Sequence, residues 1–424
     1  MALQNAFLRS RGGHAFFDVL ALKAIFKLQH FNSQDLSNMV WAYANVRASK
    51  STLFKAAGDS VVTLENLKGF KPQEISNILW VYALAEESHP WLCKKFTDHI
   101  VALHDFRDYG SQALSNILWA YATASILHPR LFKRLSDHVV AMKDLSWFKP
   151  QEISNITWAY ATAGDKSQPP LFMKIAAHIV SLDDLSGFKP QHISNITWAY
   201  ATAGQSHPPL FKKLVDVAIN RCKDFNSQAV TNIFWAFATV GQADQHSFSS
   251  CAPTVKSILD ECNSQGIANI GRAYAVANVS IPSLFNANFV IICLEKEHDF
   301  GMKDLHQLHQ WQLWQEELKS DIRLPLLLRE KCQKAFSSLP PSQSKLQDDV
   351  VSELFSIGLH PEEEVLTKSG YRFNALSVMH GKKIGIEVDG PFHFVGSKPN
   401  GCTLLKHRQV NTLDETPVIS VPYW

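Results

Sequence analysis

One arrangement of apolar and polar residues recurs seven times along the first two thirds of the chain. It reads QEISNILWVYA from Gln73, and successive copies begin 37–40 residues apart. Within a copy, apolar residues recur at i, i+3, i+4 and i+7, the spacing of one face of a helix. In the first copy these are Leu36, Met39, Val40 and Tyr43. The copies begin at Gln34, Gln73, Gln112, Gln151, Gln191, Gln228 and Gln265.

A second helical segment follows each copy. Examples are HPWLCKKFTDHIVAL from His89 and HPRLFKRLSDHVVAM from His128. Pro90 and Pro129 mark the starts of these helices, because the fixed φ of proline suits the first helical turn. A repeat of this length is typical of stacked helical pairs, which share one continuous core. We therefore predict a mainly α protein in which residues 30–294 form an α-solenoid of about seven helical-pair repeats.

Two polar or aromatic positions of the repeat hardly vary. A side chain repeated without change cannot distinguish bases, whereas an array that reads a sequence needs different side chains in different units. We interpret the constant Asn as bonding along the stack and the constant Trp as packing between units. The alternative is a sequence-independent track in which they line an RNA groove. The Asn is residue 38, 77, 116, 155, 195, 232 and 269, and the Trp is residue 41, 80, 119, 158, 198 and 235, with Arg272 in the last copy.

Two further sets of residues are candidates for RNA contact. The position after the repeated Gln varies, and its polar members, which could contact bases or simply reflect surface drift, are Asp35, Glu74, Glu152 and His192. Basic residues recur near the start of the second helix, where stacking would align them into a ribbon that follows a phosphate backbone. The alternative for these is an ordinary solvated face. They are Lys55, Lys94, Lys95, Lys133, Arg134, Lys174, Lys212 and Lys213.

The pattern changes after residue 294. Residues 295–345 are predicted to form a helical linker that ends at the Leu339-Pro340-Pro341-Ser342 break. Beyond it we expect a small α/β domain over residues 346–424. Its elements are a helix from Leu346 to Ile357, a strand before a turn at His380-Gly381, a buried strand from Ile384 to Val388 and a short strand from Val418 to Val421.

Composition narrows the class of protein. The seven cysteines include no CxxC pair, which opposes a disulfide framework and a zinc site and fits a reducing compartment. No apolar run approaches the ~18 residues of a membrane span, so no membrane association is expected. The net charge of +2 agrees with an anionic partner without requiring one. Residues 1–29 begin with an acid-free segment that carries Arg9 and Arg11, which is typical of a transit peptide, although an ordinary N-terminus has the same composition.

Both parts of the chain resemble known families. Residues 30 to 290 resemble octotricopeptide-repeat proteins and the related repeats of FAST-kinase-like proteins, which bind RNA in mitochondria or plastids. The segment IGIEVDGPFHF, the run from Gly401 to Arg408 and the closing VISVPYW look like a RAP domain. The resemblance implies RNA binding and a fold similar to restriction endonucleases. Lys406, His407 and Arg408 are then expected to contact phosphate.

The endonuclease likeness also raises an enzyme hypothesis. Such nucleases hold Mg²⁺ with acidic residues on adjacent strands and use a nearby Lys. Here Glu387 fills the Glu place, Asp389 stands where Lys is expected, and Asn374 replaces a common Asp. Glu387, Asp389 and His393 could hold a metal. The alternative is that the acids bond within the sheet and His393 lies at the turn after Gly390.

We therefore expect a non-enzymatic protein that binds single-stranded RNA and acts in processing or stability of organelle transcripts. The resemblance implies the mitochondrial matrix, or alternatively a plastid, with protein partners in an RNA-processing complex and no cofactor. Two alternatives remain. One is a Mg²⁺-dependent ribonuclease that uses the RAP-like domain, and the other is a scaffold that binds proteins along the solenoid.

Overall fold

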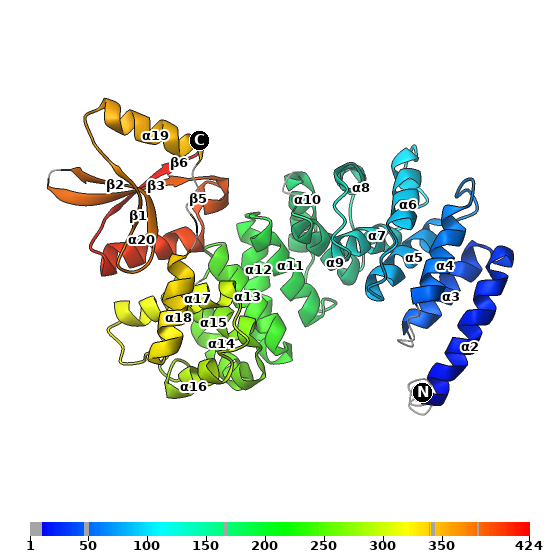
Figure 1. The fold of residues 1–424 in the computed structure, drawn as a ribbon, viewed down its shortest axis with the longest axis horizontal. Coiled ribbons are helices and arrows are strands. Elements are labelled where there is room, and N and C mark those ends of the chain that lie inside the picture. The colour runs from blue at the N-terminus through cyan, green and yellow to red at the C-terminus, as the bar shows by residue number, and fades with distance from the viewer. Residues whose placement is uncertain are drawn as a thin grey trace. The chain divides into compact units, whose positions relative to one another are not determined.

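A computed structural model of the chain describes residues 11–45, 51–164, 168–243, 245–338, 340, 344–379 and 381–424. The expected turn residue His380, most of the break around Pro340 and the first ten residues lie outside this part. The chain forms two compact units, one ending at Phe188 and one beginning at Lys189 (Figure 1). None of the described helices is long and apolar enough to cross a membrane.

The first unit consists of helical pairs, as the sequence predicts. The first helix of each pair packs against the first helix of the next, and the second helices do the same. Proline begins several of these helices, including α5 at Pro72 and α6 at Pro90. The elements are α2 (Arg11–Lys27), η1 (Leu28–His30), α3 (Ser33–Asn45), α4 (Ser51–Val62), α5 (Pro72–Leu84), α6 (Pro90–Ala102), α7 (Ser111–Thr123), α8 (Pro129–Ala141), α9 (Pro150–Thr162) and α10 (Pro169–Ser181).

A buried tyrosine ties each pair to the one before it. The Tyr82 hydroxyl donates to the Phe54 carbonyl at 2.5 Å, and Tyr160 donates to Phe132 at 2.7 Å. The same bond joins Tyr43 to the Phe17 carbonyl of α2 at 3.0 Å. Because a buried hydroxyl without a partner is costly, these bonds fix the register between pairs. Residues 11–27 therefore occupy the place of a second helix ahead of the first repeat.

The second unit continues with helical pairs and adds one that the sequence did not predict. The segment 295–345, expected as a linker, contains α17 and α18, which pack on each other, and α17 packs on α15. The helices are α11 (Pro190–Thr202), α12 (Pro208–Asn220), η2 (Cys222–Asp224), α13 (Ser227–Thr239), α14 (Gln245–Ile258), η3 (Leu259–Glu261), α15 (Ser264–Ala277), α16 (Ala287–Glu295), α17 (Met302–Glu317) and α18 (Leu326–Ser337).

A small sheet closes the second unit. Its strand order is β1-β2-β3-β6, with antiparallel pairs except for the parallel pair β3–β6. The helix near 346–357 and the strands near 384–388 and 418–421 are confirmed, whereas β1 and α20 went unpredicted. The elements are α19 (Lys345–Ser356), β1 (Glu362–Leu366), β2 (Arg372–Met379), β3 (Lys382–Asp389), η4 (Pro391–His393), β4 (Phe394–Val395), β5 (Lys398–Pro399), α20 (Gly401–Leu413) and β6 (Val418–Pro422).

Candidate nucleic-acid interface

The variable position after each repeated Gln caps its own helix. The Glu74 carboxylate accepts from the Lys71 amide at 2.9 Å, and the Glu152 carboxylate accepts from the Lys149 amide at 2.8 Å. The His192 ring accepts from the Lys189 amide at 3.2 Å in the same way. Side chains three residues into a helix satisfy otherwise unpaired amides at its start.

The variation at this position follows capping in six of the seven copies, whereas α7, with Gly110 before it and Ala113 at this position, has no side-chain cap. Asp35 and Asn32 cap each other reciprocally, at 2.9 and 3.1 Å. Where the position is Ala229 or Gly266, an Asn just before the helix supplies the cap instead. Asp35, Glu74, Glu152 and His192 therefore have a structural role at helix starts, and their contact with bases stays a prediction.

Half of the predicted basic ribbon is also occupied. Each of three cationic side chains reaches the last carbonyls of the preceding second helix, where the helix dipole favours positive charge. Lys95 donates to Val62 at 2.9 Å and also to Leu64. Arg134 contacts the Leu103 carbonyl at 2.6 Å, and Lys174 contacts that of Met142 at 2.5 Å. Lys213 also takes part in an interaction.

The other basic residues of the ribbon lie at the surface. Lys94 pairs with Asp98 at 2.6 Å, and Lys133 pairs with Asp137 at 2.9 Å. Such exposed i,i+4 pairs are weak, so a phosphate could displace the carboxylate. Lys55 and Lys212 are exposed. Four of the eight predicted members thus keep exposed side chains, and phosphate contact there stays a prediction: Lys55, Lys94, Lys133 and Lys212.

The constant Asn is the most unexpected position. In the first unit Asn77, Asn116 and Asn155 are half-buried, and Asn38 is exposed. None of these four amides forms a hydrogen bond within the described part of the chain, which contradicts our interpretation that they bond along the stack. An amide carries two donors and an acceptor with two lone pairs, so each is available to a ligand.

The constant Trp forms a ladder beside these amides. The ring centroids of Trp80 and Trp119 lie 6.1 Å apart, and those of Trp119 and Trp158 lie 6.4 Å apart. This confirms that the tryptophans of neighbouring repeats pack together. All three are only half-buried, and Trp41 is 50% exposed. Because Gln, Asn and Trp recur at spacings of four and three, they share one face of each first helix. We call the set formed by residues 73, 77, 80, 112, 116, 119, 151, 155 and 158 the stripe.

The two ends of the first helices differ in charge. Lys71 and Lys149 are exposed directly before α5 and α9. A groove of about 980 Å³ opens near the C-terminal ends of α5 and α7, and its charged lining residues are Glu86, Glu87 and the pair Lys94–Asp98, so acids outnumber bases there. Phosphate is therefore favoured at the N-terminal ends, where the helix dipole adds positive potential.

The seventh copy of the repeat is covered. Arg272 replaces Trp and is 6% exposed, and Asn269 is also buried. The Arg272 guanidinium donates to Gln310 of α17 at 2.9 Å and contacts the Cys402 sulfur of α20. A Cβ at Gly271 would press against Trp311 of α17 at 3.2 Å. In this copy, the residues that correspond to the stripe are thus contacted by α17 and α20 of the second unit.

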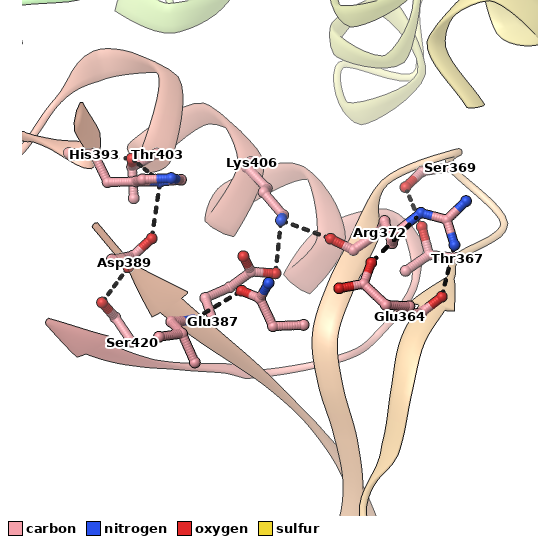
Figure 2. Close-up of polar contacts among 12 residues, drawn as sticks. Glu364, Thr367, Ser369, Arg372, Glu387, Asp389, His393, Thr403, Lys406 and Ser420 are labelled. Atoms are coloured by element: carbon pink, nitrogen blue, oxygen red, sulfur yellow. Dashed lines mark hydrogen bonds and ion pairs between the residues drawn. The ribbon is translucent and has the colours of Figure 1, made fainter. Parts of the chain in front are cut away.

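The C-terminal sheet carries a cluster of buried polar residues. Figure 2 shows Lys406 of α20 reaching the Glu387 carboxylate at 2.6 Å and the Arg372 carbonyl at 2.7 Å. Asp389 pairs with His393 at 2.9 Å and accepts a bond from Ser420. Burial raises the pKa of Glu387, while Lys406 opposes that rise. Burial would raise the pKa of Asp389, but the bonds from His393 and Ser420 bring it below its ordinary value.

The expected phosphate contacts at the end of the chain point inward. Arg408 contacts both oxygens of Glu317 at 3.2 Å and the Ala275 carbonyl at 2.5 Å. His407 is half-buried, and burial lowers its pKa. Lys406 is held by Glu387. Lys406 and Arg408 are thus engaged within the fold, and phosphate contact at the three positions stays a prediction.

The acidic residues of the cluster do not fit a magnesium site. Mg²⁺ needs near-octahedral oxygen ligands that converge on one point. Glu387 is engaged by Lys406, Asp389 by His393 and Ser420, and the Asn374 oxygen accepts from the Val388 amide at 2.9 Å. Among the described residues, no three His, Cys, Asp or Glu side chains are grouped so that they could hold a metal. The acids are instead bonded to Lys406 of α20, His393 of η4 and Ser420 of β6, so only the bond to Ser420 lies within the sheet, as the alternative expected.

The repeat region matches a known protein family. A family model described as RNA-editing substrate-binding complex 6 protein matches residues 1–278. That span ends one residue beyond α15, so it includes all seven copies of the repeat and stops before the C-terminal sheet. A search of curated proteins found no match.

Proposed function

The chain belongs to the RNA-editing substrate-binding complex 6 protein family, and on that premise we propose that its stripe binds single-stranded RNA. The family places the chain among helical-repeat proteins of RNA processing. The proposed role is post-transcriptional processing of organelle transcripts, in the mitochondrion or alternatively in a plastid. The protein would work beside protein partners, as the word complex in the family's description suggests.

The observation that carries the proposal is the row of amides without partners. The same half-buried amide, with no bond within the described residues, recurs in three neighbouring copies, so it leaves a regular row of donors and acceptors open to a ligand. An RNA strand is such a ligand, because ribose hydroxyls, phosphate oxygens and base edges all bond to amides. The adjoining tryptophans provide apolar faces for bases.

The chemistry of the stripe indicates binding without sequence preference. The same Gln, Asn and Trp recur from copy to copy, so each nucleotide meets the same groups. Exposed lysines at the helix starts, with Lys55, Lys94, Lys133 and Lys212 elsewhere on the array, would contribute a salt-dependent attraction to phosphate. Such a surface suits a protein that holds a transcript for other factors rather than one that selects a site.

The C-terminal sheet is proposed to be a RAP-like module. Its element order of helix, three antiparallel strands, helix and parallel strand supports that proposal. Because its acids are committed to internal partners, the proposal includes no cleavage step. The docking of α20 on α13, α15 and α17 suggests that the module closes the end of the array.

Fluorescence anisotropy with a labelled single-stranded RNA tests the proposal. We expect binding that weakens steeply between low and moderate salt. Combining Asn77→Ala, Asn116→Ala and Asn155→Ala should weaken binding roughly tenfold or more, since each lost bond is worth about 1 kcal/mol. The matched control combines Asn220→Ala, Asn288→Ala and Asn411→Ala, three exposed asparagines outside the stripe. Absence of binding at submillimolar protein, or binding indifferent to salt, would contradict the proposal.

A further inference from the structure

The rings of the tryptophan ladder are spaced almost far enough apart to hold a base between them. Aromatic atoms in contact lie about 3.5 Å apart, so a base held between two rings needs them about 7 Å apart. The two measured centroid distances are 6.1 and 6.4 Å, which fall short by less than about 1 Å. The rings are tilted by 38° and 33° rather than closed into parallel stacks. Small rotations of the indoles would open each gap.

These indoles are surface groups, unlike the other repeated aromatics. Tyr82, Tyr121 and Tyr160 are each at most 4% exposed and bond to the preceding pair. Trp80, Trp119 and Trp158 instead lie half-exposed on the stripe face. Helix packing would be served by a smaller or aliphatic side chain there, whereas a row of indoles provides base-sized faces.

The polar residues of the stripe lie at distances that suit the rest of a nucleotide. Along each first helix, Asn precedes Trp by three residues, or about 4.5 Å, and Gln precedes Trp by seven residues, or about 10.5 Å. A base at Trp119 would therefore place its ribose near Asn116 and its phosphate towards Gln112. The phosphate end coincides with the helix start, where Lys71 and Lys149 flank neighbouring repeats and the dipole is positive.

We infer that bases of the RNA insert between consecutive tryptophans of α5, α7 and α9, one base per repeat. This inference rests on the proposed function and specifies its contacts. Each inserted base is separated from the next by an indole, so neighbouring bases lose their stacking on one another. Trp119 borders both gaps and is the central residue of the ladder. The site takes any base, because every base has a π face.

Three measurements on the full chain test the inference. Oligouridylate is compared with an RNA of equal length that lacks bases, and the RNA without bases should bind at least tenfold more weakly. Trp119→Ala should weaken oligouridylate binding by roughly fivefold or more, and Trp119→Phe should recover most of that loss. Trp91→Ala, at a 68% exposed indole on α6, is the matched control and should bind as the wild type does. The circular dichroism of oligoadenylate should fall on binding as its bases separate.

The outcomes separate this inference from the proposed function. If RNA binds but the RNA without bases binds equally well, or if Trp119→Ala has no effect, the base slots are wrong and the broader proposal stands. If the wild type binds no RNA, both fail. Retained helical circular dichroism in Trp119→Phe guards against loss of folding as the cause. An unchanged oligoadenylate spectrum at saturation would also overturn the insertion of bases.

Discussion

The third and the seventh copies of the repeat have the same register but face different surroundings. In α7, Asn116 and Trp119 are half-exposed, and the Asn amide has no partner within the described residues. In α15, the matching Asn269 and Arg272 are buried beneath later elements of the second unit. The helix alone therefore does not determine whether the Asn and Trp positions are exposed. The elements that pack over them determine whether they remain accessible to a ligand.

The sequence difference between the two copies follows from that cover. The residue before the Trp position is Leu118 in α7, but it is Gly271 in α15, where the Trp311 ring approaches to within about van der Waals contact. Arg272 can reach Gln310 and Cys402, which an indole at that position could not satisfy. The change from Trp to Arg thus marks where the array ends and docking begins. We expect the open copies to bind RNA and the covered copy to support folding.

The strongest test of the covered face is Arg408→Met. Arg408 joins the last turn of α15 to Glu317 of α17, whose side chain is 8% exposed. Removing the guanidinium leaves that carboxylate buried with no cation and only the 3.5 Å bond from Gln409, which should lower the free energy of unfolding by about 3 kcal/mol. Thermal unfolding followed by circular dichroism measures the change. Arg130→Met, at an exposed arginine, is the control, and equal stabilities of the two variants would count against the docking role.

Arg272→Ala and Asn116→Ala should differ in their free energy of unfolding, by a smaller amount than Arg408→Met differs from its control. Losing Arg272 leaves Gln310 and Cys402 without their donor, at a cost of about 2 kcal/mol. Asn116→Ala removes no internal bond, so its stability should stay within about 0.5 kcal/mol of the wild type. At a temperature at which both variants are folded, Asn116→Ala should bind RNA more weakly than Arg272→Ala does. The contrast is refuted if Asn116→Ala unfolds more readily than Arg272→Ala.

The smallest expected effect is a change in stability with pH that originates at the buried His309. Burial lowers the pKa of His309, whose Nε2 lies 2.8 Å from the Ser369 carbonyl. Burial disfavours protonation of His309 in the folded state. The free energy of unfolding therefore decreases as the pH falls below about 6.5, the pKa of this histidine in the unfolded chain. Between pH 7.5 and 5.5 this histidine should cost no more than about 1.4 kcal/mol. His309→Gln should flatten the slope of unfolding free energy against pH, and an unchanged slope would exclude His309 as the source.

The regular part of the fold was predictable because period and polarity encode it. The first and second helices begin at Pro72 and Pro90, as their sequence positions indicate. Helices were predicted over residues 295–345, but the packing of α17 and α18 as a further pair was not, because this segment carries no copy of the repeated phrase. The strand β1 was missed because EEEVL is dominated by acidic side chains rather than by alternation.

The site was harder to predict because exposed and bonded polar residues look alike in a sequence. The repeat position of Glu74 varies between copies, as a position that reads bases would. In the structure Glu74 caps its own helix, whereas Asn226 and Asn263 cap the helices of copies that have Ala or Gly at this position. Lys95 and Lys94 are neighbours, but one binds carbonyls of the preceding repeat and the other faces solvent. Lys95, Arg134 and Lys174 follow one another at about one repeat each, and this spacing was the available signal for a structural role.

The location of RNA on the array is the central question, and photocrosslinking answers it most directly. Single-stranded RNA containing 4-thiouridine would be irradiated with the intact protein and the joined peptides identified by mass spectrometry. Our account predicts crosslinks in α5, α7 and α9, at or beside Trp80, Trp119 and Trp158. Crosslinks confined to the second helices α6 and α8, or to residues 346–424, would contradict it.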